Sequence, residues 1–178
     1  MNSRMALIWR SCFCSALSYI SEIPALSAAD FVLFWDKDTR LAKALEAVGV
    51  RVYNPAQAVV YCDDKSETHR VLAQAGIPQP ETLLAPMTYT QVTEPMDVFL
   101  SAAAERLGFP LVVKECFGSF GDQVSLANNA EELRATAYAM GPRPFVLQRF
   151  IREAAGEDVR LYVVGDRVAD EMIIADGP

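Results

Sequence analysis

The chain has 178 residues, of which 52% are hydrophobic and 22% charged, and its formal net charge is −7. This composition is typical of a globular protein with one ordinary domain or two small ones. The acidic balance argues against a nucleic-acid partner, because phosphate neutralisation needs clustered Lys and Arg, and no apolar run is long enough to predict a membrane span.

The sequence has four cysteines, which are too few for a disulfide framework in a chain of this length. The cysteines and the single histidine, His69, do not have the spacing of a zinc site. We therefore predict free thiols, a reducing cytoplasmic location and no metal ligands. Residues 1–29 imitate a secretory signal only faintly, because Arg10 interrupts the apolar part. We leave this N-terminal segment unassigned.

A short parallel α/β unit is predicted for residues 30–61. An apolar strand pattern at 31–35 precedes a helical pattern at 41–48, and Gly49 then stands at the position of a helix cap before a second strand at 50–53. A strand, a helix and a strand within so short a segment indicate a βαβ unit. Such a unit needs further strands beside it, which the sequence does not obviously supply, so we expect the remnant of a larger domain.

The rest of the chain alternates further helices and strands. Gly76 and the two prolines after it end a helix over residues 64–75. Gly165-Asp166 is a two-residue turn that predicts a hairpin of two strands near the C-terminus. The remaining elements are predicted as strands at 82–84, 111–114, 124–126 and 145–148, and as helices at 98–107 and 130–140.

Lys114 is the first candidate for chemistry, because it ends an apolar strand and directly precedes the glycine-rich residues 118–121. A lysine on a rigid strand can meet an anion as a fixed charge, and loop N–H groups can approach the same anion. The alternative is a lysine that extends from a strand end into solvent before an ordinary turn. The segment is not a Walker loop, since no Gly-Lys-Ser or Gly-Lys-Thr opens a helix.

Three further groups have weaker signals. The strand-to-loop segment 148–153 offers backbone groups to a purine edge, or is simply the end of an amphipathic strand. Asp158 and Arg160 share one face of a strand, where they bind ribose and phosphate or form a surface ion pair. Lys65 opens a helix that Asp63 or Asp64 caps, and its alternative is a solvated helix start.

The order of these motifs resembles that of the RimK-like alpha-L-glutamate ligases of the ATP-grasp superfamily, from about residue 31 to residue 168. The motifs are Cys-Asp-Asp-Lys, Gly-Ile-Pro-x-Pro-x-Thr, Pro-Leu-Val-Val-Lys, Gly-Ser-x-Gly, Gln-x-Phe-Ile-x-Glu-Ala-x-Gly-x-Asp-Val-Arg and Val-Val-Gly-Asp. The resemblance implies an α/β (α+β) ATP-grasp fold that is incomplete. Residues 30–61 would end a preceding α/β domain, and residues 62–178 would form a partial ATP-grasp domain with the small subdomain and the first strands of the large one.

The same resemblance implies roles for ten residues. Lys65 and Lys114 would contact ATP phosphates, Ser119 and Gly121 would belong to the glycine loop, and Asp158 would contact ribose. Arg160 would act near the phosphates or the acyl group. The adenine hinge would comprise Gln148, Arg149, Phe150 and Ile151. Gln123 departs from the family pattern, since many members have glycine there.

Family chemistry is ATP-dependent ligation of a carboxylate to an amine, such as that of glutamate, through an acyl phosphate. ATP and small-molecule or peptide substrates would be the partners. Magnesium would be a cofactor, but the expected Asp and Glu-x-Asn ligands would lie beyond Pro178, and neither Glu171 nor Asp176 has a second ligand at suitable spacing. The alternative is therefore an inactive nucleotide-binding fragment or a product without a stable fold. A Rossmann-type binder is disfavoured because no Gly-x-Gly-x-x-Gly follows a strand.

Overall fold

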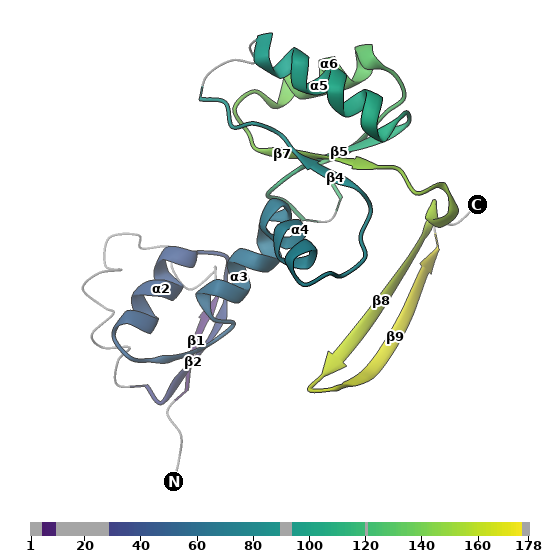
Figure 1. Cartoon of the computed structure of the whole chain (residues 1–178). Coiled ribbons are helices and arrows are strands. Elements are labelled where there is room, and N and C mark those ends of the chain that lie inside the picture. Colours follow the sequence, from purple (N-terminus) through teal and green to yellow (C-terminus); the bar gives the residue numbers. More distant parts are fainter. Residues whose placement is uncertain (1–4, 10–28, 90–93, 120, 176–178) are drawn as a thin grey trace.

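The computed structural model describes residues 5–9, 29–89, 94–119 and 121–175 (Figure 1). Its strands form three separate sheets, which follow one another along the chain. The first is parallel and belongs to an N-terminal α/β unit; the second has four antiparallel strands; the third is a two-stranded hairpin. Two consecutive helices join the first sheet to the second (Figure 1).

The N-terminal unit confirms the predicted parallel βαβ pattern. Strand β2 (Phe31–Trp35) pairs in parallel with β3 (Arg51–Tyr53), and helix α2 (Thr39–Ala47) connects them. Asp38 caps the helix, because its side chain accepts hydrogen bonds from two backbone N–H groups of the first turn. Buried apolar residues of both strands and the helix form one cluster, namely Val32, Phe34, Leu41, Ala42, Leu45, Val50, Val52 and Ala56.

Two elements in this part of the chain were not predicted from the sequence. Strand β1 (Met5–Trp9) pairs in parallel with β2, so the sheet has the order β1-β2-β3 and the missing neighbour comes from the segment left unassigned. Helix α3 (Ala56–Asp63) was not predicted, and only Asp64 separates it from α4 (Lys65–Gln74). Asp64, rather than Asp63, caps α4 by accepting a hydrogen bond from Ser66 N.

The second sheet is antiparallel throughout and has the strand order β4-β7-β5-β6. Helices α5 (Glu94–Leu107) and α6 (Ala130–Met140) lie on one face of this sheet, while α4 lies toward the other face (Figure 1). Helix α5 begins four residues before the predicted start at Val98. The bounds are β4 (Thr82–Leu84), α5 (Glu94–Leu107), β5 (Leu111–Glu115), β6 (Val124–Ala127), α6 (Ala130–Met140) and β7 (Phe145–Arg149).

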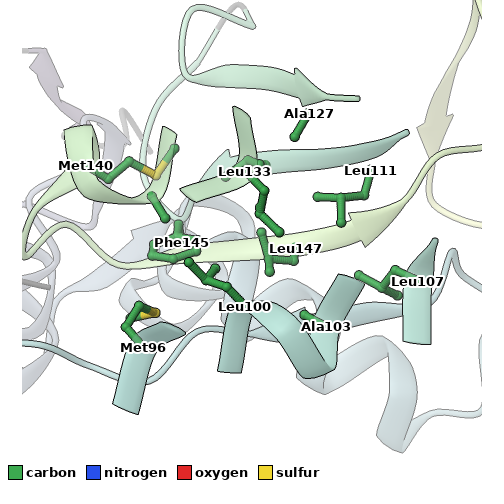
Figure 2. Packing of buried hydrophobic residues seen from close by; sticks show 12 residues of the cluster. Met96, Leu100, Ala103, Leu107, Leu111, Ala127, Leu133, Met140, Phe145 and Leu147 are labelled. Carbon is green, nitrogen blue, oxygen red and sulfur yellow. The ribbon is translucent and has the colours of Figure 1, made fainter. Parts of the chain in front are cut away.

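The core of this unit lies between the sheet and helices α5 and α6 (Figure 2). Helix α5 contributes side chains spaced three and four residues apart, which is one face of a helix. Strands β5 and β7 contribute alternate residues, which is one face of a sheet. The cluster contains Met96, Leu100, Ala103, Leu107, Leu111, Val113, Ala127, Leu133, Ala137, Met140, Phe145 and Leu147.

After β7 the chain passes through a short 3-10 helix (Arg152–Ala154) into the predicted hairpin of β8 (Glu157–Val164) and β9 (Arg167–Ala175). A register shift interrupts the pairing between Tyr162 and Val163. The hairpin projects away from the four-stranded sheet (Figure 1), and every residue of β8 is exposed.

Candidate functional site

The four-stranded sheet presents a polar pair on the face opposite its helical core. Residues Leu111 and Val113 of β5 point into the core, so Lys114 points to the other face, as does Gln148 of β7. Lys114 Nζ donates a hydrogen bond to Gln148 Oε1 over 2.7 Å. Gln148 is only 6% exposed and is the one buried polar residue among those described. A buried amide is costly unless it is hydrogen-bonded, so this pairing is a defined feature of the sheet.

The remaining contacts of Gln148 come from residues that the sequence did not single out as site residues. Gln148 Nε2 donates to Thr82 Oγ1 on the adjacent strand β4 over 2.8 Å. The same nitrogen lies 3.2 Å from Nε2 of His69, which is on α4. A glutamine at the end of the apolar run of β7 was the available signal, because a polar residue there demands partners. The sequence cannot name partners that are 66 and 79 residues away.

The structure brings Lys65 to the glycine loop and close to Lys114, whereas Lys114 itself bonds to Gln148. The role of both lysines in phosphate binding stays a prediction. Lys65 begins α4, and its Nζ donates to Gly118 O over 3.1 Å while its backbone N–H donates to Cys116 O over 2.9 Å. Burial of Lys114 lowers the pKa of its amine, and the nearby positive charge of Lys65 lowers it further. Two lysines held this close repel one another, and a bound polyanion would relieve that repulsion.

The glycine loop has backbone conformations that favour glycine. Gly118 has φ +132° and Gly121 has φ +83°. A Cβ atom added to Gly118 would collide with the side-chain amide of Gln123, the residue that departs from the family pattern. Because Gln123 fills the space beside Gly118, this loop is more closely packed than a loop with glycine at that position would be.

Lys37 connects the glycine loop to the N-terminal unit and was not predicted. It follows β2, and its Nζ donates to Ser119 Oγ over 2.9 Å and forms an ion pair with Asp63 at the end of α3. A cleft of about 400 Å³ lies beside this contact. Its lining residues are Lys37, Asn54, Ala58, Val59, Cys62, Asp63 and Ser119.

The predicted adenine hinge follows directly from β7. Arg149 turns its side chain away from Lys114, since it forms an ion pair with Glu81 at 2.5 Å and donates to Arg106 O over 3.2 Å. The backbone N–H of Arg149 also donates to Glu81 O, over 2.9 Å, so neither this N–H nor the side chain is free for a ligand on the lysine side of the sheet. Phe150 is partly buried, and Ile151 is 38% exposed just before the short 3-10 helix.

Asp158 and Arg160 share a face of β8, as the strand pattern predicts, and form an ion pair at 3.3 Å with both side chains exposed. Among the described residues, no hydrogen bond or ion pair joins either of them to Lys65, Lys114 or Gln148. The described structure thus shows the surface ion pair, and their assignment to ribose and to the acyl group stays a prediction.

The described residues contain no group of three His, Cys, Asp or Glu side chains placed to hold a metal ion. Asp176 lies outside them, and so do Cys12 and Cys14. Cys62 and Cys116 are free thiols, and burial raises the pKa of Cys116. No helix in the described ranges is both long and apolar enough to cross a bilayer.

The architecture is that of an ATP-grasp fold. The chain matches the crystal structure of a RimK domain ATP-grasp protein from Sphaerobacter thermophilus with a TM-score of 0.66 and 23% identity, over 95% of this chain and 72% of that one. More distant ATP-grasp structures in this comparison include complexes with ATP and with ADP.

The family profile of the RimK-like ATP-grasp domain matches residues 62–175, and the chain belongs to that family. It is 36% identical over 140 residues to the uncharacterized protein MG012 of Mycoplasma genitalium, over 77% of this chain and 48% of that protein. It is 34% identical over 139 residues to beta-citrylglutamate synthase B of Mus musculus, over 78% of this chain and 34% of that protein. The chain thus spans half the length of these curated relatives or less.

Proposed function

We propose that this chain binds the phosphates of ATP between Lys65, Lys114 and the glycine loop, as part of an ATP-dependent carboxylate–amine ligase. The observation that carries the proposal is that the Lys65 amine donates to Gly118 O of the glycine loop and lies close enough to Lys114, 49 positions further along the sequence, for its charge to lower the Lys114 pKa. Membership of the RimK-like ATP-grasp family and the nucleotide complexes among its structural neighbours support it.

The adenine would lie against the lysine side of the sheet, next to the segment from Gln148 to Ile151. The backbone N–H of Arg149 already donates to Glu81 O over 2.9 Å, so the purine edge would meet the backbone of Phe150, and Ile151 would supply an apolar surface. Asp158 and Arg160, proposed for ribose and the reacting acyl group, lie on the hairpin that projects away from the sheet (Figure 1), and a shift of the hairpin would bring them toward the nucleotide. Ligand binding can select such a rearrangement when it gains contacts in the second state.

In the proposed reaction an oxygen of a carboxylate attacks the γ-phosphorus of ATP, which forms an acyl phosphate and releases ADP. The amine of glutamate or a similar amino acid then attacks the acyl carbon, phosphate leaves, the amine loses a proton and an amide forms. Lys65 and Lys114 would stabilise the negative charge of the transferred phosphate group and hold that group in position. We assign no described residue to magnesium.

A titration of the chain with ADP tests the binding proposal. Lys114→Met keeps the length of the side chain and removes its charge, so we expect affinity to fall about tenfold or more, as for loss of a charge-assisted hydrogen bond. Lys43→Met is the matched control, because Lys43 is exposed on α2. Equal affinity of the parent and Lys114→Met would exclude the phosphate role.

Turnover is a separate question, because the chain spans only part of its relatives. A second candidate is nucleotide binding without ligation. Phosphate release from ATP that depends on both glutamate and an added carboxylic acid would support the ligase. Lys114-dependent binding with no phosphate release would support the second candidate.

A further inference from the structure

A chain of hydrogen bonds runs behind Lys114 into the protein. Lys114 Nζ donates to Gln148 Oε1 over 2.7 Å, and Gln148 Nε2 lies 3.2 Å from His69 Nε2. Nδ1 of His69 lies 2.5 Å from Gln79 Oε1, and Gln79 Nε2 donates to the backbone oxygen of His69 over 2.9 Å. The chain therefore links the proposed phosphate-binding lysine to a histidine on α4 and to the loop before β4.

The groups at the two ends of this chain of hydrogen bonds determine which atom donates and which accepts in each bond. An ammonium group has only donors, so Gln148 must turn its oxygen toward Lys114 and its NH₂ toward His69. His69 Nε2 must then accept. A backbone carbonyl only accepts, so Gln79 must turn its NH₂ toward it and its oxygen toward Nδ1. The imidazole is therefore neutral, with its proton on Nδ1.

Thr82 does not discriminate between the two orientations of the Gln148 amide. Its hydroxyl lies 2.8 Å from Gln148 Nε2, and a hydroxyl accepts a hydrogen bond as readily as it donates one. A neutral imidazole nitrogen without a proton only accepts. His69 is thus the contact that favours the orientation in which oxygen, and not NH₂, faces the ammonium of Lys114.

We propose that His69, protonated on Nδ1 through its contact with Gln79, is a positioning residue that holds the Gln148 amide as an acceptor for Lys114. The inference rests on the proposed function, since it concerns the lysine assigned to the nucleotide phosphates. Without this contact the Gln148 amide loses one of the two interactions that fix its orientation, so its oxygen holds the ammonium of Lys114 less firmly in the position that meets the phosphate.

The arrangement also makes nucleotide binding sensitive to pH. A doubly protonated imidazole donates from both nitrogens, so Gln148 must rotate its oxygen toward His69 and away from Lys114. Among the described charged residues, Arg70 and Glu81 line the same pocket as His69, and Lys114 is linked to it through Gln148. Arg70 is paired with Glu67, and Glu81 is paired with Arg106 and Arg149. Hydrogen bonds from arginine lower the carboxyl pKa of both Glu67 and Glu81.

The first test needs no nucleotide. His69 is the sole histidine of the sequence, so ¹⁵N NMR of the 178-residue chain reports one imidazole. We expect the Nδ1-protonated tautomer near neutral pH in the parent. Lys114→Met leaves Gln79 in place and should keep this tautomer, as should the control Lys43→Met, whereas Lys114→Met combined with Gln79→Leu frees both ends of the chain and should give a mixture of tautomers. An Nε2-protonated imidazole in the parent or in Lys114→Met, or an unmixed Nδ1 tautomer in the double variant, would overturn the proposal.

The second test is ADP affinity. His69→Leu removes the acceptor, and we expect roughly threefold to tenfold weaker binding, the range for one lost hydrogen bond. His69→Gln restores an acceptor that does not titrate, so it should bind ADP like the parent at neutral pH and lose the weakening under acidic conditions. Parent-like affinity of a folded His69→Leu, or an equally steep pH profile of His69→Gln, would refute positioning by His69. If the parent binds no ADP, the proposed function fails, and the tautomer measurement alone decides the inference.

Discussion

The four-stranded sheet and the β8–β9 hairpin are both antiparallel, but they differ in what stabilises them. The sheet has its helices α5 and α6 packed on one face, with side chains such as Leu111 and Leu147 fully buried (Figure 2). Strands β8 and β9 of the hairpin are each longer than any strand of the sheet, and none of their residues is buried. Backbone hydrogen bonds pair the strands in both, so pairing alone does not produce a core.

Hydrogen bonds and apolar burial thus contribute differently to the stability of the two regions. One hydrogen bond makes a net contribution of about 1 kcal/mol to stability, and an isolated two-stranded hairpin is only marginally stable in water. Burial of a leucine contributes roughly 1.5–3 kcal/mol and adds up over a cluster. The site residues Lys114 and Gln148 lie on the packed sheet, whereas Asp158 and Arg160 lie on the hairpin. The phosphate-binding half of the proposed site is therefore the rigid half.

The largest effect is expected from a matched pair of leucines. Leu147→Ala creates a cavity in the sheet core, where Leu147 is 0% exposed, and should lower the free energy of unfolding by about 2–5 kcal/mol. Leu161→Ala acts on a hairpin side chain that is 55% exposed, and its effect should stay within about 0.5 kcal/mol. Denaturant unfolding followed by circular dichroism measures both.

Similar losses for the two leucine variants would contradict the comparison, because they would show that the hairpin packs against an apolar surface in solution. Amide hydrogen exchange gives an independent control. Amides of β5 and β7 should exchange only on global unfolding, while those of β8 and β9 should exchange through local opening.

A middle-sized effect is expected from two glycines. Gly118→Ala places a side chain at φ +132°, so we expect a loss of about 1–3 kcal/mol in the same unfolding measurement. Gly165→Asn in the hairpin turn should change stability by no more than about 0.5 kcal/mol. Its φ of +64° suits asparagine, and nothing lies within 4 Å of an added Cβ.

The Gln123 contact can be separated from the backbone strain at Gly118. The colliding atoms belong to the end of a flexible side chain, so Gln123→Ala removes the collision and leaves the φ angle unchanged. The double variant Gly118→Ala/Gln123→Ala should therefore keep most of the loss. Full recovery in the double variant would mean that crowding, and not backbone conformation, requires glycine at position 118.

Local patterns predicted much of the fold. Residues 130–140 have acidic residues in their first turn and form α6 with the predicted bounds, and Gly165-Asp166 forms the predicted hairpin turn. Strand β1 was missed because its significance lies in its pairing with β2, 26 positions further along the chain. Helix α3 was missed because its apolar residues show little helical periodicity.

The candidate site was predicted in part. Lys65, Lys114 and the glycine loop stand out because charged residues next to glycines and apolar strands are visible in a linear sequence. Lys37 and His69 do not stand out, since each matters only through a contact across 82 or 79 positions. A lone histidine without metal-ligand spacing gave no signal until α4 placed it beside Gln148.

The smallest effect is expected from two ion pairs, one in each region. Arg134 on α6 forms two hydrogen bonds with Asp97 on α5, at 2.8 and 3.1 Å, and so joins the two core helices. Its hydrogen bonds lower the pKa of Asp97 below the ordinary value of 3.8. A carboxyl whose pKa is lowered in the folded state stabilises the protein above its unfolded pKa, and this contribution is lost as the pH falls through the folded-state pKa.

Asp97→Asn should therefore be slightly less stable than the parent at pH 7, and the difference should disappear in acid below the ordinary aspartate value of 3.8. Asp158→Asn breaks the single 3.3 Å contact with Arg160 and should leave stability unchanged at both pH values. Unfolding measured for both variants across this pH range separates the two regions once more. A loss in Asp158→Asn at pH 7 as large as that in Asp97→Asn would show that the hairpin pair is ordered and contributes to the folded structure.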